Sequence, residues 1–275
     1  MRLAQLQKTN SVPVHILFYH RVSDDHPNPW SISCDGFQKQ IDWLQENFDL
    51  VSLSEAQRRI REGNDRPAVS ITFDDGYSEN CEFALPMLVE RRIPVTYFVT
   101  TYHTTHGKPF PHDIETGQPL PTNSIESIRA LANAGVEIGG HTRTHADLGS
   151  GLTDEQLYDE VIASTREMES MIEHPIRYFA FPYGQRANLD SRVFDLLKKN
   201  GYSGVCSAYG GFNAIGQDTF HLQRIHGDPN FTRMVNWLTG DPRIARVVSY
   251  DWESMLKSRP ELNQNQTQQE LVETS

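Results

Sequence analysis

Two acidic residues and two histidines in this sequence have the types and the spacing of a site that handles a metal ion or a proton. Asp74 and Asp75 are adjacent in "SITFDDGY", residues 70–77, and a glycine follows them. His141 and His145 are four residues apart in "GGHTRTHADL", residues 139–148. Two imidazoles with a distant carboxylate make a three-ligand set for a catalytic divalent metal, with positions left open for water.

Two further segments end in groups that could complete such a site. The apolar run of "ILFYHRV", residues 16–22, stops at His20 and Arg21, so it either reaches the surface there or delivers a titratable group to a site. "RYFAFPYG", residues 177–184, runs into a Pro-Tyr-Gly turn. Such a turn can present the backbone N–H of Tyr183 and an aromatic wall, although an ordinary loop would have the same pattern.

These candidates lie at the ends of short apolar segments with strand propensity. The expected strands are Val14–His20, Leu50–Leu53, Ala68–Phe73, Val95–Val99, Val136–Gly139, Arg177–Phe181, Tyr202–Cys206 and His221–Ile225. Helical segments follow most of them, and no glycine-rich dinucleotide loop supports an open sheet. The pattern therefore predicts an α/β fold, a distorted (β/α) barrel with seven or eight mostly parallel strands, which places its site at the strand ends.

The segments outside this alternation carry weaker signals. Residues 100–122 are rich in His, Thr, Pro and Gly and are expected to form a long loop. His103, His106, His112 and Asp113 lie in it and could contact a metal or a substrate, but no strand would fix them. We expect one catalytic domain over residues 12–255 and a polar, disordered tail over residues 256–275.

Composition excludes some classes of partner. The net charge of −11 argues against nucleic acid and against an anionic membrane surface. No apolar run has the length needed to cross a bilayer, so membrane insertion is not expected. The N-terminal residues lack a signal-peptide pattern, which predicts a cytoplasmic chain, or a periplasmic or secreted one if an export signal has been removed. Nothing in the sequence indicates the oligomeric state.

The motifs "TFDDG", "HTRTH" and "FPYG", in that order, resemble the polysaccharide deacetylase family, carbohydrate esterase family 4 with its NodB-homology domain, over roughly residues 12–240. The resemblance implies a distorted barrel, a divalent metal that is usually zinc, and hydrolysis of N-acetyl groups, mostly on N-acetylglucosamine. By position it implies Asp75, His141 and His145 as metal ligands. It also implies Asp74 as the catalytic base and the Tyr183 N–H as the oxyanion donor.

The sequence departs from the family pattern in two places. An arginine commonly precedes the prolines of the third motif, where this chain has Ala180 and Phe181. In the family, a motif near the C-terminal end of the domain usually carries the histidine that acts as the general acid. The corresponding segment here is "LQRIHGD", with Arg224 and His226, and it matches that motif poorly.

Both gaps can be filled from elsewhere in the chain. "YHRV", followed by "F..QIDWL" and "VSL.E", resembles a branch of the family that includes biofilm poly-N-acetylglucosamine deacetylases, where an N-terminal histidine replaces the late one. This resemblance implies His20 as the acid, with His226 as the alternative. We further infer that Arg224 supplies the missing guanidinium to Asp74, unless it forms only a structural salt bridge.

The leading interpretation is a metal-dependent N-deacetylase, with an N-acetylated sugar in a glycan or glycan precursor as its substrate. A deacetylase or amidohydrolase of a small amide on the same barrel is an alternative, favoured by a narrow site closed by residues 100–122. An open groove with exposed Trp30 or Tyr183 would favour a polymer. A non-catalytic glycan-binding module is the third possibility, and the presence of both aspartates and both histidines argues against it.

Overall fold

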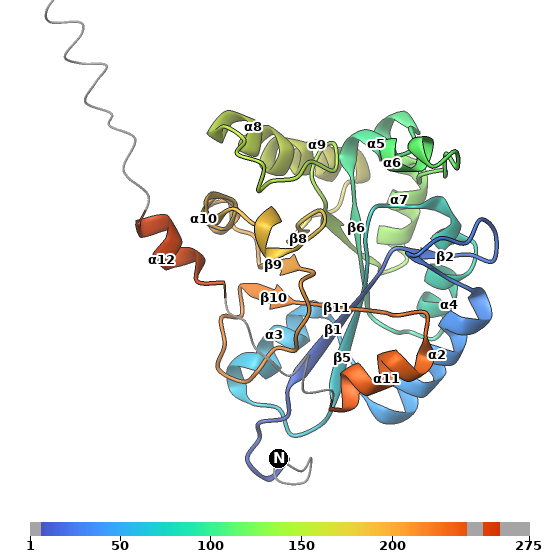
Figure 1. Ribbon diagram of the computed structural model, residues 1–275, viewed down its shortest axis with the longest axis vertical. Helices are drawn as coiled ribbons and strands as arrows, with labels where there is room; N and C mark the ends of the chain where they lie inside the picture. Colours follow the sequence, from blue (N-terminus) through green and yellow to red (C-terminus); the bar gives the residue numbers. More distant parts are fainter. Residues whose placement is uncertain (1–6, 241–249, 259–275) are drawn as a thin grey trace, which may run out of the picture.

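A parallel sheet forms the centre of the molecule in the computed structural model, which describes residues 7–240 and 250–258 (Figure 1). Eight strands follow the order β10-β9-β8-β7-β6-β5-β1-β11, β4 lies beside β5, and every described ladder is parallel. The strands are β1 (Val14–Tyr19), β4 (Asp49–Leu50), β5 (Ala68–Phe73), β6 (Val95–Val99), β7 (Glu137–Gly140), β8 (Tyr178–Ala180), β9 (Gly204–Ser207), β10 (His221–Gln223) and β11 (Ile225–His226). A small separate sheet pairs β2 (Arg21–Val22) with β3 (Ser31–Ile32).

The connection between the two edge strands nearly closes this sheet into a barrel. Only Arg224 separates β10 from β11 in the chain, so the two edges must lie next to each other. The Asn213 side-chain amide donates to the carbonyl of Gln223 in β10 at 2.9 Å and to that of Val14 in β1 at 3.3 Å. The prediction of a distorted (β/α) barrel is therefore confirmed.

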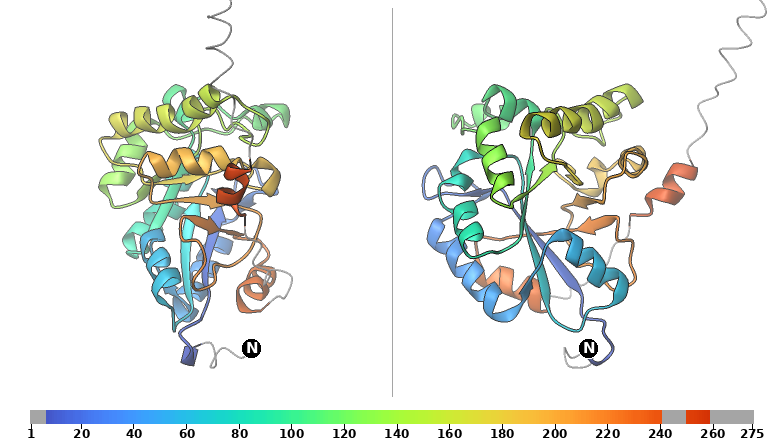
Figure 2. Two further views of the ribbon diagram at one scale, coloured as in Figure 1. Left: turned by 90° about the vertical axis from the view of Figure 1, so that its left-hand side faces the viewer. Right: turned by 180° about the vertical axis from the view of Figure 1, so that it is seen from behind.

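Helices surround the strands, as the views from three sides show (Figures 1 and 2). The helical segments are α2 (Cys34–Asn47), α3 (Leu53–Glu62), η1 (Ser78–Cys81), α4 (Ala84–Glu90), α5 (Thr101–His106), α6 (Pro111–Glu115), α7 (Ile125–Asn133), α8 (Asp154–Tyr158), η2 (Asp159–Ala163), α9 (Ser164–Ile172), η3 (Arg186–Asn188), α10 (Ser191–Lys199), α11 (Phe231–Thr239) and α12 (Trp252–Lys257). In α2, Phe37, Ile41 and Leu44 are fully buried on one face. The helices therefore cover the outer face of the barrel with their apolar sides.

The strands are buried on both faces because helices cover the outside and side chains fill the inside. Val14 and Ile16 of β1 belong to an apolar cluster with Phe98, Ala180 and other residues of the barrel interior. Leu17 and Tyr19 of the same strand instead join the cluster that the outer helices form. Even-numbered residues of β1 thus point inward, and this alternation sets which side chains can reach the site.

The expected loop over residues 100–122 is wrong, because α5 and α6 lie within it. Gly107 ends α5 in a left-handed conformation with φ of 59°, and Pro111 stands at the start of α6. The same residue types that indicate a loop also stop and start short helices. The expected strand at His221–Ile225 is interrupted at Arg224, and the expected strand at Leu50–Leu53 ends at Leu50 because Ser52 caps α3.

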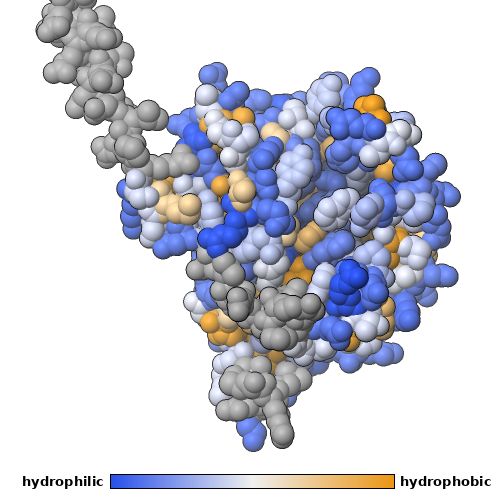
Figure 3. Space-filling view, viewed as in Figure 1, coloured by the Kyte–Doolittle hydropathy of each residue, from blue (hydrophilic) through white to orange (hydrophobic). Residues whose placement is uncertain are grey.

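Two features of the described residues bear on the expected boundaries and partners. The domain boundaries stay a prediction; residue 256 lies within α12, and residues 259–275 of the expected tail lie outside the described part. Within the described helices none is long and apolar enough to span a bilayer. The face of the molecule in Figure 3 is largely hydrophilic, with apolar residues in small groups.

Candidate metal and catalytic site

The alternation along three neighbouring strands points a set of polar side chains into one end of the barrel. His20 continues the inward-facing series of β1, and Asp74 continues that of β5 beyond Ala68 and Thr72. Arg224 stands in the same series as the buried Leu222, at the junction of β10 and β11. Because these strands are parallel neighbours, their carboxyl ends bring the three groups to one place.

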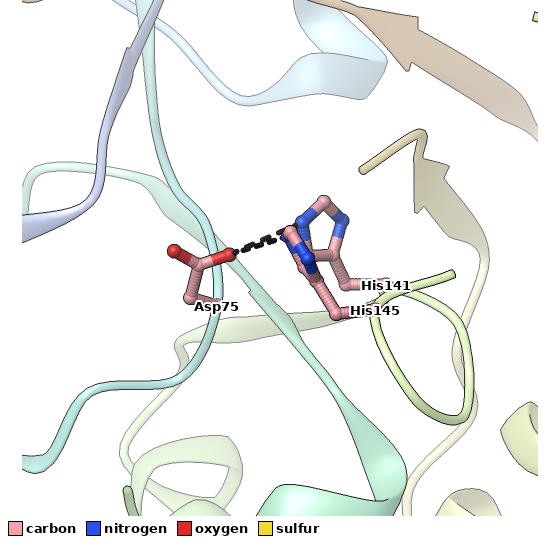
Figure 4. Close-up of side chains that lie close together, drawn as sticks. All are labelled: Asp75, His141 and His145. Atoms are coloured by element: carbon pink, nitrogen blue, oxygen red, sulfur yellow. Dashed lines mark ion pairs between the residues drawn. The ribbon is translucent and has the colours of Figure 1, made fainter. Parts of the chain in front are cut away.

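Asp75, His141 and His145 form a cluster in which one ligand atom from each lies within 4.8 Å of the others. Nε2 of His145 is 3.2 Å and Nε2 of His141 is 3.4 Å from Asp75 Oδ1, and Figure 4 shows both imidazoles facing this carboxylate. The other ring nitrogen of His141, Nδ1, lies 2.8 Å from the carbonyl of Ala180. A carbonyl partner of this kind orients a metal-ligating imidazole and leaves Nε2 for the ion.

The polar atoms of this cluster fit a divalent cation. Asp75 Oδ1 is buried and makes no hydrogen bond within the described structure. Burial acts to raise the pKa of Asp75, but His141, His145 and His20 hold that pKa well below its ordinary value. Burial of an ionised carboxylate is energetically costly unless a positive charge compensates it. A cation bound by this carboxylate and the two imidazoles would supply that charge.

Backbone conformation at the cluster is unusual for the residue types present. Asp75 has φ of 74° and His145 has φ of 63°, in the left-handed region that non-glycine residues rarely adopt. Thr142, between the two histidines, has φ of 62°. Such conformations persist when the surroundings hold them, and they concentrate at functional sites.

Glu160 holds the loop that carries the two histidines. Its Oε2 accepts hydrogen bonds from the backbone N–H groups of Arg143 and Thr144 at 2.9 and 3.0 Å, and its Oε1 accepts from the Thr144 hydroxyl at 2.8 Å. Glu160 lies in η2, a π-helical turn between α8 and α9. Such turns occur often at functional sites, because they redirect a side chain out of the helical pattern.

Asp74 forms a two-pronged ion pair with Arg224. Arg224 Nη1 and Nη2 lie 2.7 and 2.8 Å from the two oxygens of the carboxylate, and both side chains are buried. Burial acts to raise the pKa of Asp74, but the Arg224 guanidinium, aided by His141 and His20, outweighs it and lowers that pKa. The carboxylate therefore stays ionised and fixed in orientation.

Arg224 is itself held on all sides. Its Nε donates to the carbonyl of Ser207 at 3.0 Å, and its Nη1 also donates to the Thr72 hydroxyl at 3.0 Å. Its guanidinium carbon lies 5.1 Å from the ring centre of Phe18 and 5.3 Å from that of Phe98. A Cβ at position 139 would overlap the Phe98 ring, so Gly139 is required for this packing.

His20 lies between aromatic rings at the carboxyl end of β1. Its ring centre is 4.8 Å from that of Trp30 and 5.6 Å from that of Phe18, and its Nδ1 is buried without a partner in the described residues. Burial lowers the pKa of His20, against the opposing effect of Asp75 and Asp74. His226 lies behind it, with its ring centre 6.4 Å away, and burial lowers the pKa of His226 to about 4.

Tyr183 lies on the far side of the cluster, in the turn after β8. It has φ of 60°, and its ring centre is 4.9 Å from that of His145. No described residue offers an acceptor to the Tyr183 N–H. Tyr183 is 56% exposed.

A cleft of about 710 Å³ opens above these groups. Its walls include His20, Asp74, Asp75, His141, His145 and Tyr183, together with Trp30, Tyr77, His112 and Asp113. Trp30 is 54% exposed. Of the four weaker candidates in residues 100–122, His112 and Asp113 line the cleft, whereas His103 and His106 do not.

Four contributors were missing from the sequence interpretation. Thr72 could have been found, because it precedes Asp74 by two residues on the same face of β5. The carbonyl of Ala180, the Glu160 carboxylate and the ring of Phe98 could not, because they arrive from elements whose mutual placement only the fold determines.

Known proteins match this chain in sequence and in structure. The family model described as polysaccharide deacetylase matches residues 61–205. The protein YxkH of Bacillus subtilis (strain 168) is 24% identical over 220 residues, which are 79% of this chain and 72% of YxkH. A chitooligosaccharide deacetylase of Sinorhizobium fredii (strain NBRC 101917 / NGR234) is 30% identical over 128 residues, 45% of this chain and 50% of that protein.

A solved structure has the same fold. IcaB from Ammonifex degensii superimposes with a TM-score of 0.67 and 23% sequence identity, over 83% of this chain and 98% of that one. At this identity the likeness concerns the fold alone. The chain thus shares its fold with this solved structure.

Proposed function

The chain belongs to the polysaccharide deacetylase family, and from this premise we propose that it is a metal-dependent N-deacetylase of glycans that contain N-acetylglucosamine. One observation carries the proposal. A three-ligand cluster, in which a buried Asp75 oxygen faces two imidazoles without a hydrogen bond, stands beside a carboxylate, Asp74, that Arg224 keeps ionised.

Asp75, His141 and His145 would hold the cation, and two imidazoles with one carboxylate are a ligand set that catalytic zinc uses. Zinc bound to such a set lowers the pKa of its water to about 7 and polarises a carbonyl as a Lewis acid.

Asp74 is assigned as the general base. Its lowered pKa leaves it ionised at neutral pH, so it can accept a proton from the attacking water. The two-pronged contact with Arg224 leaves the carboxylate little rotational freedom. Arg224 is therefore a positioning residue, which acts on the reaction through Asp74.

The Tyr183 N–H is assigned to the oxyanion that develops on the acetyl carbonyl. Its lack of an acceptor leaves it available to the substrate, and a donor of this kind typically contributes about 3 kcal/mol to transition-state stabilisation. The left-handed conformation at this residue holds the N–H in place.

His20 is assigned as the general acid. An amine leaves an amide only when it is protonated, and His20 lines the cleft on the same side as Trp30. His226 remains the alternative acid, but it does not line the cleft, whereas His20 does and interacts with the charges of Asp75 and Asp74.

The open cleft favours a sugar chain over a small amide. Trp30 and Tyr183 expose aromatic surface on which a sugar ring can stack, and a relative of 30% identity is a chitooligosaccharide deacetylase. Within residues 100–122, His112, Asp113, Thr116 and Gln118 line part of the cleft. The chain should therefore accept oligomers.

Acetate release tests the proposal. Purified protein loaded with zinc should release acetate from N-acetylglucosamine tetramers faster than from the monosaccharide or from a simple acetamide. Treatment with a chelator should stop the release, and added zinc should restore it. Faster release from the small amide than from the tetramer would favour the small-substrate alternative.

A further inference from the structure

The wall of the cleft formed by α6 carries a polar cluster that the proposed reaction does not use. The Tyr77 hydroxyl donates to Asp113 Oδ2 at 2.9 Å and lies 3.1 Å from His112 Nε2. Tyr77 is anchored in turn, because the Tyr97 hydroxyl and the Asn123 amide both donate to its carbonyl, at 2.7 and 3.1 Å. The cluster is thus a fixed part of the wall.

Asp113 differs from the other two carboxylates that line the cleft. Asp74 has the Arg224 guanidinium, and Asp75 has two imidazoles at its Oδ1. Among the described residues, Asp113 Oδ2 accepts from one neutral hydroxyl, and Oδ1 has only His112 Nε2 at 3.6 Å, an ion pair only when that imidazole is protonated. Burial raises the pKa of Asp113, whereas the other two are lowered. The site lacks a cation at this carboxylate.

No cation from the cleft wall fills this role in the described structure. Arg21 is the single Arg or Lys among the lining residues. Its guanidinium is committed to Glu79, with Nε at 2.8 Å from Oε2, and to the carbonyl of His26. The ligand must therefore supply any permanent positive charge that Asp113 meets.

We propose that Asp113 binds the ammonium group of a glucosamine unit, an already deacetylated sugar next to the unit that is being processed. The inference rests on the proposed function, because the reaction itself produces such amines, and a carboxylate within hydrogen-bond distance favours the protonated form of an amine. Asp113 is then a specificity-determining residue. Deacetylation would extend along a chain from units that already carry a free amine.

Binding of glucosamine tetramer tests this directly, since that ligand has no acetyl group to lose. Titration calorimetry should show that Asp113→Asn binds the tetramer about tenfold more weakly than the wild type, because a charged partner strengthens a hydrogen bond. Asparagine can still accept from Tyr77, so the fold should survive, and thermal unfolding checks this. Glu115→Gln is the matched control, because Glu115 lies on the same helix, is exposed and does not line the cleft.

A fully acetylated ligand, which carries no ammonium group, tests whether Asp113 recognises an ammonium or a hydroxyl. The KM for fully acetylated tetramer should stay within about twofold in Asp113→Asn, whereas the KM for a tetramer with one glucosamine unit should rise about tenfold. Equal loss on both substrates would assign Asp113 to a hydroxyl and overturn the proposal. Unchanged glucosamine binding in Asp113→Asn, or no binding by the wild type, would overturn it as well.

Failure of the proposed function would look different. If the zinc-loaded protein released no acetate, the acetylated tetramer would serve as an intact ligand for the same titrations. Selective loss of glucosamine binding in Asp113→Asn would then show an amine-binding wall on a protein without this activity. Equal binding of both tetramers by both proteins would contradict the role of Asp113.

Discussion

The two ends of β1 each carry a histidine, and the two surroundings differ completely. His15, at the amino end, lies with its ring centre 6.0 Å from that of Phe48 and 6.1 Å from that of Phe212. His20, just beyond the carboxyl end, lines the cleft among Trp30 and the two aspartates. Both Nδ1 atoms are buried without a partner in the described structure.

Residue type alone therefore does not distinguish these two histidines; the end of the strand on which each lies does. At the amino end, the His15 ring has aromatic rings around it. At the carboxyl end, loops from several strands meet and can bring charged partners to one place. Changes at the carboxyl end should alter chemistry, whereas changes at the amino end should alter stability.

The largest effect is expected at the ligand cluster. Asp75→Ala or His141→Ala should lose the bound metal and all measurable acetate release, because each removes one of three ligands. Metal content after dialysis and acetate release measure the two losses. Full metal occupancy in both variants would show that the cation is held elsewhere.

The next largest effect is expected at Asp74. Asp74→Asn is nearly isosteric but cannot accept the proton, so it should retain metal and lose about 10²- to 10⁴-fold in rate. Asp49→Asn is the matched control, since Asp49 lies in β4 at the amino end and also pairs with an arginine, Arg59, at 2.9 Å. Wild-type turnover in Asp74→Asn would mean that another group is the base.

His20 can be compared with His15 in the same assay. His20→Ala should keep fold and metal but lose about 10²-fold in amide cleavage, the lower end of general acid catalysis. The rate of hydrolysis of an activated acetate ester should fall far less, because the leaving group of that ester needs no proton. His15→Leu should leave both reactions unchanged. An equal loss on amide and ester in His20→Ala would contradict the acid role.

A smaller effect is expected at Arg224. Arg224→Lys keeps one charge but loses the second contact with Asp74, so the rate should fall about tenfold. The pKa of Asp74 should rise, because the guanidinium lowers it. The acid limb of the pH–rate profile should therefore move to higher pH. A change in stability with an unchanged limb would leave Arg224 a structural ion pair.

Much of this arrangement could be predicted from local patterns. The barrel followed from alternating strands and helices, and "DDG" and "HTRTH" marked strand ends that do meet. Residues 100–122 could not be predicted, because proline and glycine bound short helices as readily as loops. Asp113 was named only as a weak candidate for contact with a metal or a substrate, because its position in the cleft depends on the contact between α6 and Tyr77.

The role of Arg224 could be predicted only in part from the sequence. Its pairing with Asp74 was inferred from a missing arginine elsewhere, and the two side chains are in contact. The reason for the contact lies in the seam of the barrel, where one residue joins both edges of the sheet. No local pattern in "LQRIHGD" reports that the sheet closes there.

The smallest effect concerns His15 and the dependence of stability on pH. Burial lowers the pKa of His15 to about 4, whereas an unfolded histidine titrates near 6.5. Between these values the unfolded chain binds a proton that the folded chain does not, so stability falls as the pH drops from about 6.5 to about 4 and then levels off. The difference in pKa corresponds to about 3 kcal/mol.

Replacing His15 should therefore reduce the acid sensitivity of the fold without touching the reaction. We expect the unfolding free energy of the wild type, measured with urea, to fall more between pH 7 and pH 4.5 than that of His15→Leu, by about 2 kcal/mol. His221, which burial also shifts to a pKa of about 4, stays in both proteins, so some sensitivity must remain. If the two proteins lost the same free energy over this range, His15 would be protonated in the folded state. The two phenylalanine rings beside it would then not keep the imidazole neutral.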